Sequence, residues 1–320
     1  MLIGISGTIS SGKAEVVRYL TFQGFEIIQL ASSSFSISTK AKNFDVHKSF
    51  ETIDELVDFV TLNWRRNFVI SHMDNPDLVD ILHKRPFFLQ VSVDAPIKMR
   101  YERFVASGAS CTLEEFIKLD DDLLYYGKTP LIQIIHQAHV DIVNTSASVR
   151  DLYVKLSELN LLDKERLRPT WDSYFMRLAD LAALRSNCMK RRVGAVIVRS
   201  SRVVATGYNG TPRHLTNCNE GGCDRCNKGP GSGAGLSTCL CLHAEENALL
   251  EAGRDRIGED SVLYCNTCPC LTCSIKIVQS GIKEVVYAQS YSMDEATHRV
   301  MKEAKVVLRQ FQPPRDELFV

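Results

Sequence analysis

The chain has 320 residues, which is enough for two domains of ordinary size. Its composition, 45% hydrophobic and 24% charged, is typical of a soluble globular protein. Lysine plus arginine and aspartate plus glutamate balance at 38 each, so the basic excess usual in nucleic-acid-binding proteins is missing. No apolar run is long enough to cross a bilayer. We therefore expect neither a membrane protein nor a nucleic-acid partner.

The first residues and the cysteines indicate the compartment. Residues 1–6 have no basic segment and soon give way to polar residues, so we expect no signal peptide. Ten of the 11 cysteines lie between Cys188 and Cys273. In a two-domain chain without a signal peptide, this clustering favours metal binding over disulfides. We expect the protein in the reducing environment of the cytoplasm, and the sequence leaves the nucleus open as a second location.

A glycine-rich loop follows the first predicted strand and precedes a segment with helical spacing. It has the G-x-x-x-x-G-K pattern of a phosphate-binding loop, with Gly7, Gly12 and Lys13 at the defining positions. Its backbone N–H groups and Lys13 can cradle phosphate. Ala14, however, stands where Ser or Thr should offer a hydroxyl to Mg²⁺. We therefore predict nucleotide binding at most, without phosphoryl transfer.

The rest of the N-terminal half alternates between strands and helices. Buried strands are predicted over 87–93 and 138–145, a helix over 149–159, and a polar loop over 32–43. This alternation implies a parallel α/β sheet. The order over about the first 160 residues resembles small P-loop nucleotide kinases and dephospho-coenzyme-A kinases. The resemblance implies a degenerate kinase-like domain with a binding or scaffolding role; an active kinase and a glycine-rich turn without a ligand are the alternatives.

A charged stretch that ends in proline, residues 161–169, separates the two halves. We place the boundary there, with the P-loop kinase-like domain over 1–163 and the second domain over 164–320. In the second domain a helix is expected over 171–187 and a β-hairpin over 193–208, followed by alternating helices and strands. This order predicts an α/β/α layered domain.

The second domain contains a compact metal-binding pattern. His243 and Glu245 form H-x-E, Cys270 and Cys273 form P-C-x-x-C, and together these motifs are the known signature of the zinc deaminases. Cys270 and Cys273 fall on one face of a helical turn, and His243 would be the third zinc ligand, which leaves a fourth position for water. Glu245 is placed to carry a proton of that water. The alternative is a structural zinc site in which Glu245 is a surface helix residue.

Further segments narrow the resemblance to one family. They are residues 171–176, 185–188, 193–198, 207–212, 243–248 and 281–287. Over about residues 170 to 312 the chain resembles deoxycytidylate (dCMP) deaminase, and the N-terminal addition resembles the fungal form of that enzyme. The resemblance implies a cytidine-deaminase-like domain that hydrolyses dCMP to dUMP and ammonia, which supplies dUMP for thymidylate synthesis. It also implies activation by dCTP, inhibition by dTTP with Mg²⁺, and a homo-oligomer, often a hexamer.

Two other functions remain as alternatives. One is a base or tRNA deaminase of the same superfamily, against which the neutral net charge argues only weakly. The other is a structural zinc module that binds a partner. A panel of cytosine nucleotides as substrates separates these interpretations.

The resemblance also implies contacts outside the zinc signature. It places Asn209 against the deoxyribose and Tyr291 beside the substrate, and it makes Arg185 and Arg254 candidates for phosphate or effector contacts. Each has a structural alternative, because Asn-Gly is a common turn dipeptide, a tyrosine at a strand end often only packs, and most arginines are solvated.

Six further cysteines lie outside the signature. They are Cys188, Cys218, Cys223, Cys226, Cys239 and Cys241. They include a C-x-x-C knuckle and a C-x-C pair, which indicate a closed structural zinc that would hold the glycine-rich segment 229–235 near the active site. The resemblance matches Cys188 and Cys218 to the family's second zinc site, and spacing does not decide which of the other four complete it. We expect two zinc ions per chain, one catalytic and one structural.

Overall fold

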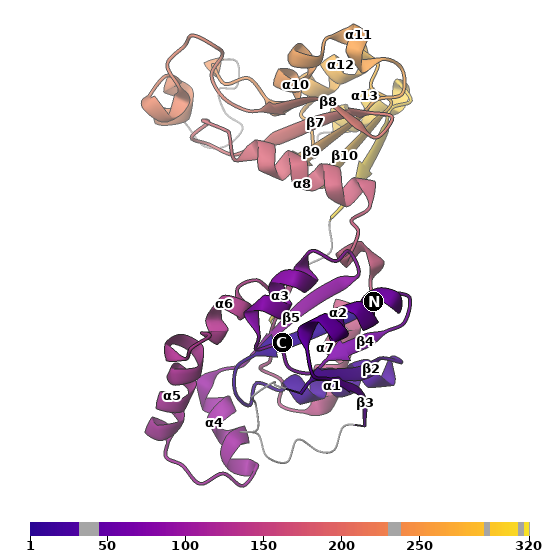
Figure 1. Ribbon diagram of the computed structural model, residues 1–320. Helices are drawn as coiled ribbons and strands as arrows, with labels where there is room; N and C mark the ends of the chain where they lie inside the picture. The colour runs from indigo at the N-terminus through magenta and orange to yellow at the C-terminus, as the bar shows by residue number, and fades with distance from the viewer. Residues whose placement is uncertain (32–44, 230–237, 291–294, 313–316, 320) are drawn as a thin grey trace. The chain divides into compact units, whose positions relative to one another are not determined.

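The computed structural model divides the chain into two compact units (Figure 1). The residues it describes are 1–31, 45–229, 238–290, 295–312 and 317–319. Unit 1 comprises Met1–Arg168 together with Arg315–Val320, and unit 2 comprises Pro169–Pro314. The boundary predicted after residue 163 falls a few residues before this division. The end of the chain, which the sequence assigned to the second domain, belongs to unit 1.

The end of the chain joins unit 1 as an edge strand. This strand, β12 (Glu317–Phe319), pairs in parallel with β6 (Val140–Val143). In the register of this pair, Leu318 lies opposite Ile142. No local sequence pattern indicates the pairing of two segments so far apart in the chain. The sequence analysis therefore assigned these residues to the other domain.

Unit 1 is built on a seven-stranded parallel sheet of order β12-β6-β5-β1-β4-β2-β3. Its other strands are β1 (Leu2–Gly7), β2 (Glu26–Leu30), β3 (Val46–Phe50), β4 (Phe68–Ile70) and β5 (Phe88–Asp94). Every residue of β1 is buried, as expected for a central strand that is covered on both faces. The prediction of a parallel α/β sheet is confirmed.

Helices pack on both faces of this sheet. They are α1 (Lys13–Phe22), α2 (Ile53–Leu62), α3 (Pro76–His83), α6 (Leu131–Ile135) and α7 (Val149–Leu159). Unit 1 also contains α4 (Ile97–Ala106) and α5 (Leu113–Asp121), which contact each other. Because side chains alternate along β1, Ile3 and Ile5 pack with α1 and α7 in one core, whereas Leu2 packs with α2, α3 and α6 in the other.

The loop of residues 7–13 connects β1 to α1. Gly7 has φ of 141°, and a Cβ there would lie 2.0 Å from the backbone oxygen of Val93, so only glycine fits. Lys13 is the first residue of α1, and its Nζ donates hydrogen bonds to the carbonyl oxygen of Gly7 at 2.9 Å and to that of Thr8. Gly7 therefore allows the close approach of this loop to β5, and the lysine of the loop contacts the loop itself.

Unit 2 contains a five-stranded mixed sheet of order β11-β10-β9-β7-β8. Its strands are β7 (Gly194–Arg199), β8 (Arg202–Tyr208), β9 (Val262–Thr267), β10 (Glu284–Gln289) and β11 (Val307–Gln310). The predicted hairpin is β7 and β8, which pair antiparallel through a tight turn at Ser200 and Ser201. Both serines have positive φ, as the favoured two-residue hairpin turn requires.

Helices lie on both faces of the second sheet, which confirms the α/β/α prediction. They are α8 (Trp171–Ala183), α10 (Ala244–Ala252), α11 (Arg254–Ile257), α12 (Leu271–Ser280) and α13 (Glu295–Glu303). The short helix α9 (Asp224–Lys228) instead packs among the additional cysteines. Phe175 and Met176 of α8 pack against Val196 and Tyr264 on one face. The apolar sides of α10, α12 and α13 pack on the other face. The H-x-E and P-C-x-x-C motifs lie on this second face, at the starts of α10 and α12.

Three predicted features fall wholly or partly outside the described residues. The polar loop over 32–43 and Tyr291 lie entirely outside them, and the glycine-rich segment 229–235 does so beyond Gly229. Among the residues that the structure does describe, no helix combines the length and apolarity that a membrane span needs.

Candidate metal centre and substrate site

Two helix starts bring the three predicted metal ligands together. His243 is the residue before α10, Cys270 is the residue before α12, and Cys273 lies in the first turn of α12. The Nδ1 atom of His243 lies 3.4 Å from the sulfur of Cys270 and 3.3 Å from that of Cys273. Ligands of one tetrahedral zinc ion are about 3.6 Å apart for typical Zn–N and Zn–S bonds. The residues therefore fit a zinc ion, as the sequence predicted.

Tight packing holds these helix starts in place. Gly207 of β8 meets the start of α10 so closely that a Cβ would lie 2.1 Å from the backbone oxygen of Ala244. Lys276 of α12 forms an ion pair with Glu246 of α10 at 2.5 Å. The positive ends of two helix dipoles thus point at the same site, where they stabilise thiolates.

The electrostatics of the ligands favour the metal-binding form of Cys270. Hydrogen bonds from Cys273 and then His243 lower the pKa of the Cys270 thiol to about 3, against the effect of burial. The same contact with Cys270 raises the pKa of His243 to about 8. These contacts favour the thiolate of Cys270, the form that binds a metal, and a metal bound to His243 would compete with the proton of its imidazole.

Glu245 is a buried carboxyl in the first turn of α10, only 3% exposed. Burial raises the pKa of this carboxyl above its usual range, because a carboxylate is disfavoured away from water. A carboxyl whose pKa lies nearer neutrality can both accept and return a proton, which is the property of a general acid–base group.

A cavity of about 170 Å³ connects these residues to neighbouring segments. The residues that line it are Cys188, Lys190, Arg191, Val193, Asn209, Arg225, Cys239, Cys241, His243, Ala244, Glu245, Thr267, Cys268 and Cys270. The lining includes His243, Glu245 and Cys270 together with three cationic side chains. The cavity can therefore accommodate a polar molecule that carries negative charge.

Asn209 lines this cavity, but the backbone already engages its side chain. The Oδ1 atom accepts a hydrogen bond from the N–H of Val193 at 2.8 Å, and Nδ2 donates to the carbonyl oxygen of Arg191 at 2.7 Å. The next residue, Gly210, pairs through its backbone with Leu242, the residue before His243. Asn209 therefore fixes the chain around the cavity, and its remaining amide hydrogen and lone pair are the atoms with which it could contact a ligand.

The two arginines predicted to contact phosphate or effector lie elsewhere. Arg185 and Arg254 are both exposed, and neither is among the residues that line the cavity. Lys190, Arg191 and Arg225 line it instead, and our sequence interpretation did not single them out. The basic run at Lys190 and Arg191, just after Cys188, was the available signal.

The six additional cysteines gather beside the cavity, and all of them are free thiols. They form two possible metal-binding groups, one of Cys188, Cys218, Cys226 and Cys241, and one of Cys223, Cys226, Cys239 and Cys241. Within each group the sulfur atoms lie within 4.8 Å of one another. The sequence spacing did not decide which cysteines complete the second zinc site. In the structure the two groups share Cys226 and Cys241.

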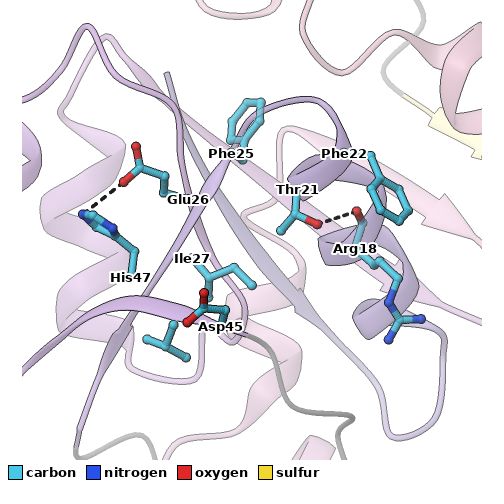
Figure 2. A pocket seen from close by; sticks show the side chains of 9 residues that line it. Arg18, Thr21, Phe22, Phe25, Glu26, Ile27, Asp45 and His47 are labelled. Carbon is cyan, nitrogen blue, oxygen red and sulfur yellow. Dashed lines mark hydrogen bonds and ion pairs between the residues drawn. The ribbon is translucent and has the colours of Figure 1, made fainter.

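A larger hollow in unit 1 differs in character from this cavity. It measures about 660 Å³ and lies between α1, β2 and β3. Figure 2 shows that Glu26 turns toward His47, with which it pairs at 3.0 Å, while Thr21 bonds to the backbone of Arg18. Glu26 also pairs with Arg66 at 2.5 Å. Glu26, His47 and Thr21 in this lining are therefore already engaged by neighbouring residues.

Comparisons with known proteins find a matching family model, full-length relatives and a solved structure that covers part of the chain. Residues 169–289 match the family model described as the cytidine and deoxycytidylate deaminase zinc-binding region. The chain is 50% identical over 321 residues to the deoxycytidylate deaminase of Schizosaccharomyces pombe, with 99% of each chain covered. It is 46% identical to that of Saccharomyces cerevisiae, with 97% of this chain and 96% of the relative covered. A crystal structure of the cyanophage S-TIM5 dCMP deaminase with dCMP and dUMP covers 43% of this chain and 94% of that chain, at 31% identity and a TM-score of 0.35.

Proposed function

The chain belongs to the deoxycytidylate deaminase family, whose reaction is the hydrolysis of dCMP to dUMP and ammonia, and from this premise we propose which residues carry the reaction. The observation that supports the assignment is the single cavity that contains Glu245 together with His243 and Cys270. The family match covers a zinc-binding region, and the three candidate ligands have the donor atoms and spacing that zinc prefers.

His243, Cys270 and Cys273 would hold the catalytic zinc ion. A zinc ion bound there supplies a Lewis acid that makes a water molecule a nucleophile near neutral pH. Three protein ligands leave one coordination position for that water, which distinguishes a catalytic from a structural site.

Glu245 moves the protons of the reaction. It accepts a proton as the water oxygen adds to C4 of the cytosine ring, and it gives a proton to N3. A second proton from the added water then passes through the same carboxyl to the amino group, which leaves C4 as ammonia. Burial supports this role, because it brings the pKa of the carboxyl closer to the operating pH.

Lys190, Arg191 and Arg225 would bind the 5′-phosphate of dCMP. All three line the cavity, and Arg191 is positioned by a hydrogen bond from its Nη2 to Gln289 Oε1 at 2.8 Å. Cationic side chains at one cavity favour a nucleotide over an uncharged nucleoside. Asn209 would contact the deoxyribose through the part of its amide that the backbone leaves unused.

Regulation and assembly follow from the family resemblance. We propose that dCTP activates the enzyme, that dTTP with Mg²⁺ inhibits it, and that it works as a homo-oligomer, with a hexamer as the expected form. Unit 1 would serve assembly or regulation, because Ala14 deprives its loop of the hydroxyl that magnesium-dependent phosphoryl transfer uses.

Replacement of the proposed acid–base group tests the mechanism. Glu245→Gln should keep its zinc and its fold but lose at least about a thousand-fold in kcat, because the ligands remain and the proton carrier is gone. Glu251→Gln is the matched control, since it removes a carboxyl of the same helix that pairs with Arg213 at the surface, outside the cavity. Turnover of dCMP should be measured beside zinc content and thermal unfolding. Wild-type turnover by Glu245→Gln would remove Glu245 from the mechanism.

A further inference from the structure

The two overlapping groups of cysteine sulfurs in unit 2 have the geometry of a shared metal cluster. A zinc ion surrounded by four sulfurs at about 2.3 Å holds those sulfurs about 3.8 Å apart. Cys188 and Cys226, in the first group, are 3.8 Å apart. In the second group, Cys239 lies 3.9 Å from Cys223 and 3.6 Å from Cys226. Both groups therefore match a tetrahedral site.

The two cysteines that belong to both groups fit a bridging position. The sulfurs of Cys226 and Cys241 lie 3.8 Å apart, which is the length of one edge of a zinc–sulfur tetrahedron. Two tetrahedra can share this edge. These separations are far longer than the roughly 2.0 Å of a disulfide, so the sulfurs approach as ligands do and not as bonded pairs.

We propose that the six cysteines hold a binuclear zinc cluster in which the sulfurs of Cys226 and Cys241 bridge two ions. Cys188 and Cys218 complete one ion, and Cys223 and Cys239 complete the other. Each ion then has four sulfur ligands and no open position, as in a structural site. A single ion would use one group of four and leave two sulfurs of the other group without a metal, beside a thiolate-bound ion.

The surroundings of the cluster fit its ligands and its charge. Backbone N–H groups of Met189 and Leu240 donate to the sulfurs of Cys218 and Cys223, each at 3.4 Å, and both acceptors are non-bridging ligands in the proposed cluster. Two divalent ions offset four of the six thiolate charges, whereas one ion offsets two. Arg225 lies against Cys226 and opposes part of the remaining negative charge.

The cluster would also shape the substrate cavity. Cys188, Cys239 and Cys241 line that cavity, and Cys241 is two residues before His243. The two ions join the segment after α8, the segment around α9 and the segment that leads into α10. Their loss should therefore displace the start of α10 and weaken substrate binding as well as lower stability.

Metal content tests the proposal on the full-length enzyme, purified reduced and zinc-replete. Together with the proposed catalytic ion, the cluster predicts three zinc ions per chain by elemental analysis. Cys241→Ser, which removes a bridge, should retain about one, while the control Cys111→Ser in unit 1 should retain three. His243→Ala should retain two and keep the cluster. Two ions in the wild type, with one of them lost in Cys241→Ser, would overturn the binuclear cluster.

A second measurement on the wild type remains decisive if the cysteine variants do not fold. After replacement of zinc by isotopically labelled cadmium, the two cluster ions should give separate NMR resonances that are scalar-coupled through the bridging sulfurs. A third, uncoupled resonance belongs to the site of His243. Absence of that third resonance would contradict the proposed catalytic site and leave the cluster standing. A single all-sulfur resonance, or two without coupling, would overturn the cluster.

Discussion

Each unit carries a sequence motif at the start of a helix: the G-x-x-x-x-G-K loop in unit 1, and H-x-E with P-C-x-x-C in unit 2. The polar side chains of the two motifs are arranged differently. In unit 2, the ligand atoms of His243, Cys270 and Cys273 lie within 4.8 Å of one another, and Glu245 lines the same cavity as His243 and Cys270. In unit 1, Gly7 keeps the turn, while the ammonium group of Lys13 contacts the loop's own carbonyl oxygens. The glycine of a sequence motif can thus be fixed by backbone packing while the charged side chain of the same motif is engaged within its own loop. Metal binding and catalysis also require that polar side chains lie close together at one cavity.

Removal of a proposed metal ligand is the strongest test that the motif residues of unit 2 form one reaction centre. His243→Ala should reduce turnover by at least about a thousand-fold and reduce bound zinc by one ion per chain, because two thiolates alone bind the ion weakly. Elemental analysis and a dCMP assay measure both effects on the same sample. Full zinc content with full activity would show that the signature is not the reaction centre.

Removal of one cavity cation should have a smaller and more selective effect. Lys190→Met should lower kcat/KM for dCMP about 10- to 100-fold, the range expected when a charged hydrogen bond to phosphate is lost. It should hardly change the activity toward deoxycytidine, which has no phosphate. Arg185→Met is the control, because Arg185 is exposed and outside the cavity. With dCTP saturating, a selective loss in Arg185→Met and none in Lys190→Met would favour the original sequence candidate.

Replacement of Lys13 in the loop of unit 1 should change the pH dependence of the stability of unit 1 and leave dCMP turnover unchanged. Burial, followed by the charge of Arg100, lowers the pKa of Lys13 to about 8, whereas an unfolded lysine titrates near about 10.4. The unfolded state therefore binds the proton more tightly, and the penalty for folding is complete below about pH 8 and disappears as the pH rises to about 10. Stability of unit 1 should rise over this window in the wild type relative to Lys13→Met.

The chain offers a direct way to measure this difference. Its two tryptophans lie in different units, Trp64 in unit 1 and Trp171 in unit 2. In a Trp171→Phe background, denaturant unfolding followed by tryptophan fluorescence reports on unit 1. If the free energy of unfolding varies with pH in the same way for the lysine and methionine versions, the pKa of Lys13 is the same in the folded and unfolded states. Lys13 would then be solvated in the folded protein.

The smallest expected effect is the gain of kinase activity on repair of the loop. Ala14→Ser restores the hydroxyl that a magnesium-dependent loop uses, yet we expect no phosphate transfer from ATP to dCMP by the wild type or the variant. The interaction of Lys13 with the carbonyl oxygens of Gly7 and Thr8 is the reason, because that ammonium would have to leave them to reach a nucleotide. Measurable transfer by the wild type would identify unit 1 as an active kinase.

Local patterns made the proposed metal site predictable. Cys270 and Cys273 are about one helical turn apart, which indicated their common orientation, and the known H-x-E and P-C-x-x-C signature joined His243 to them. The phosphate-binding candidates were not predictable in this way. Lys190 and Arg225 reach one cavity only because β7, α9 and the segment before α10 pack together. Asn209 illustrates the same limit, since its hydrogen bonds to the backbone of Arg191 and Val193 leave no trace in its sequence neighbourhood.

Strand β12 has a consequence for how the protein is made and dissected. Because the chain leaves unit 1 after Arg168 and returns to it at Arg315, unit 2 is topologically an insertion between two parts of the other unit. The ribosome therefore delivers the last strand of the first sheet only after the whole deaminase unit has emerged. A fragment that ends near Arg168 would expose the edge of β6, a site prone to mispairing, so studies of the isolated unit should carry residues 315–320 as an added segment.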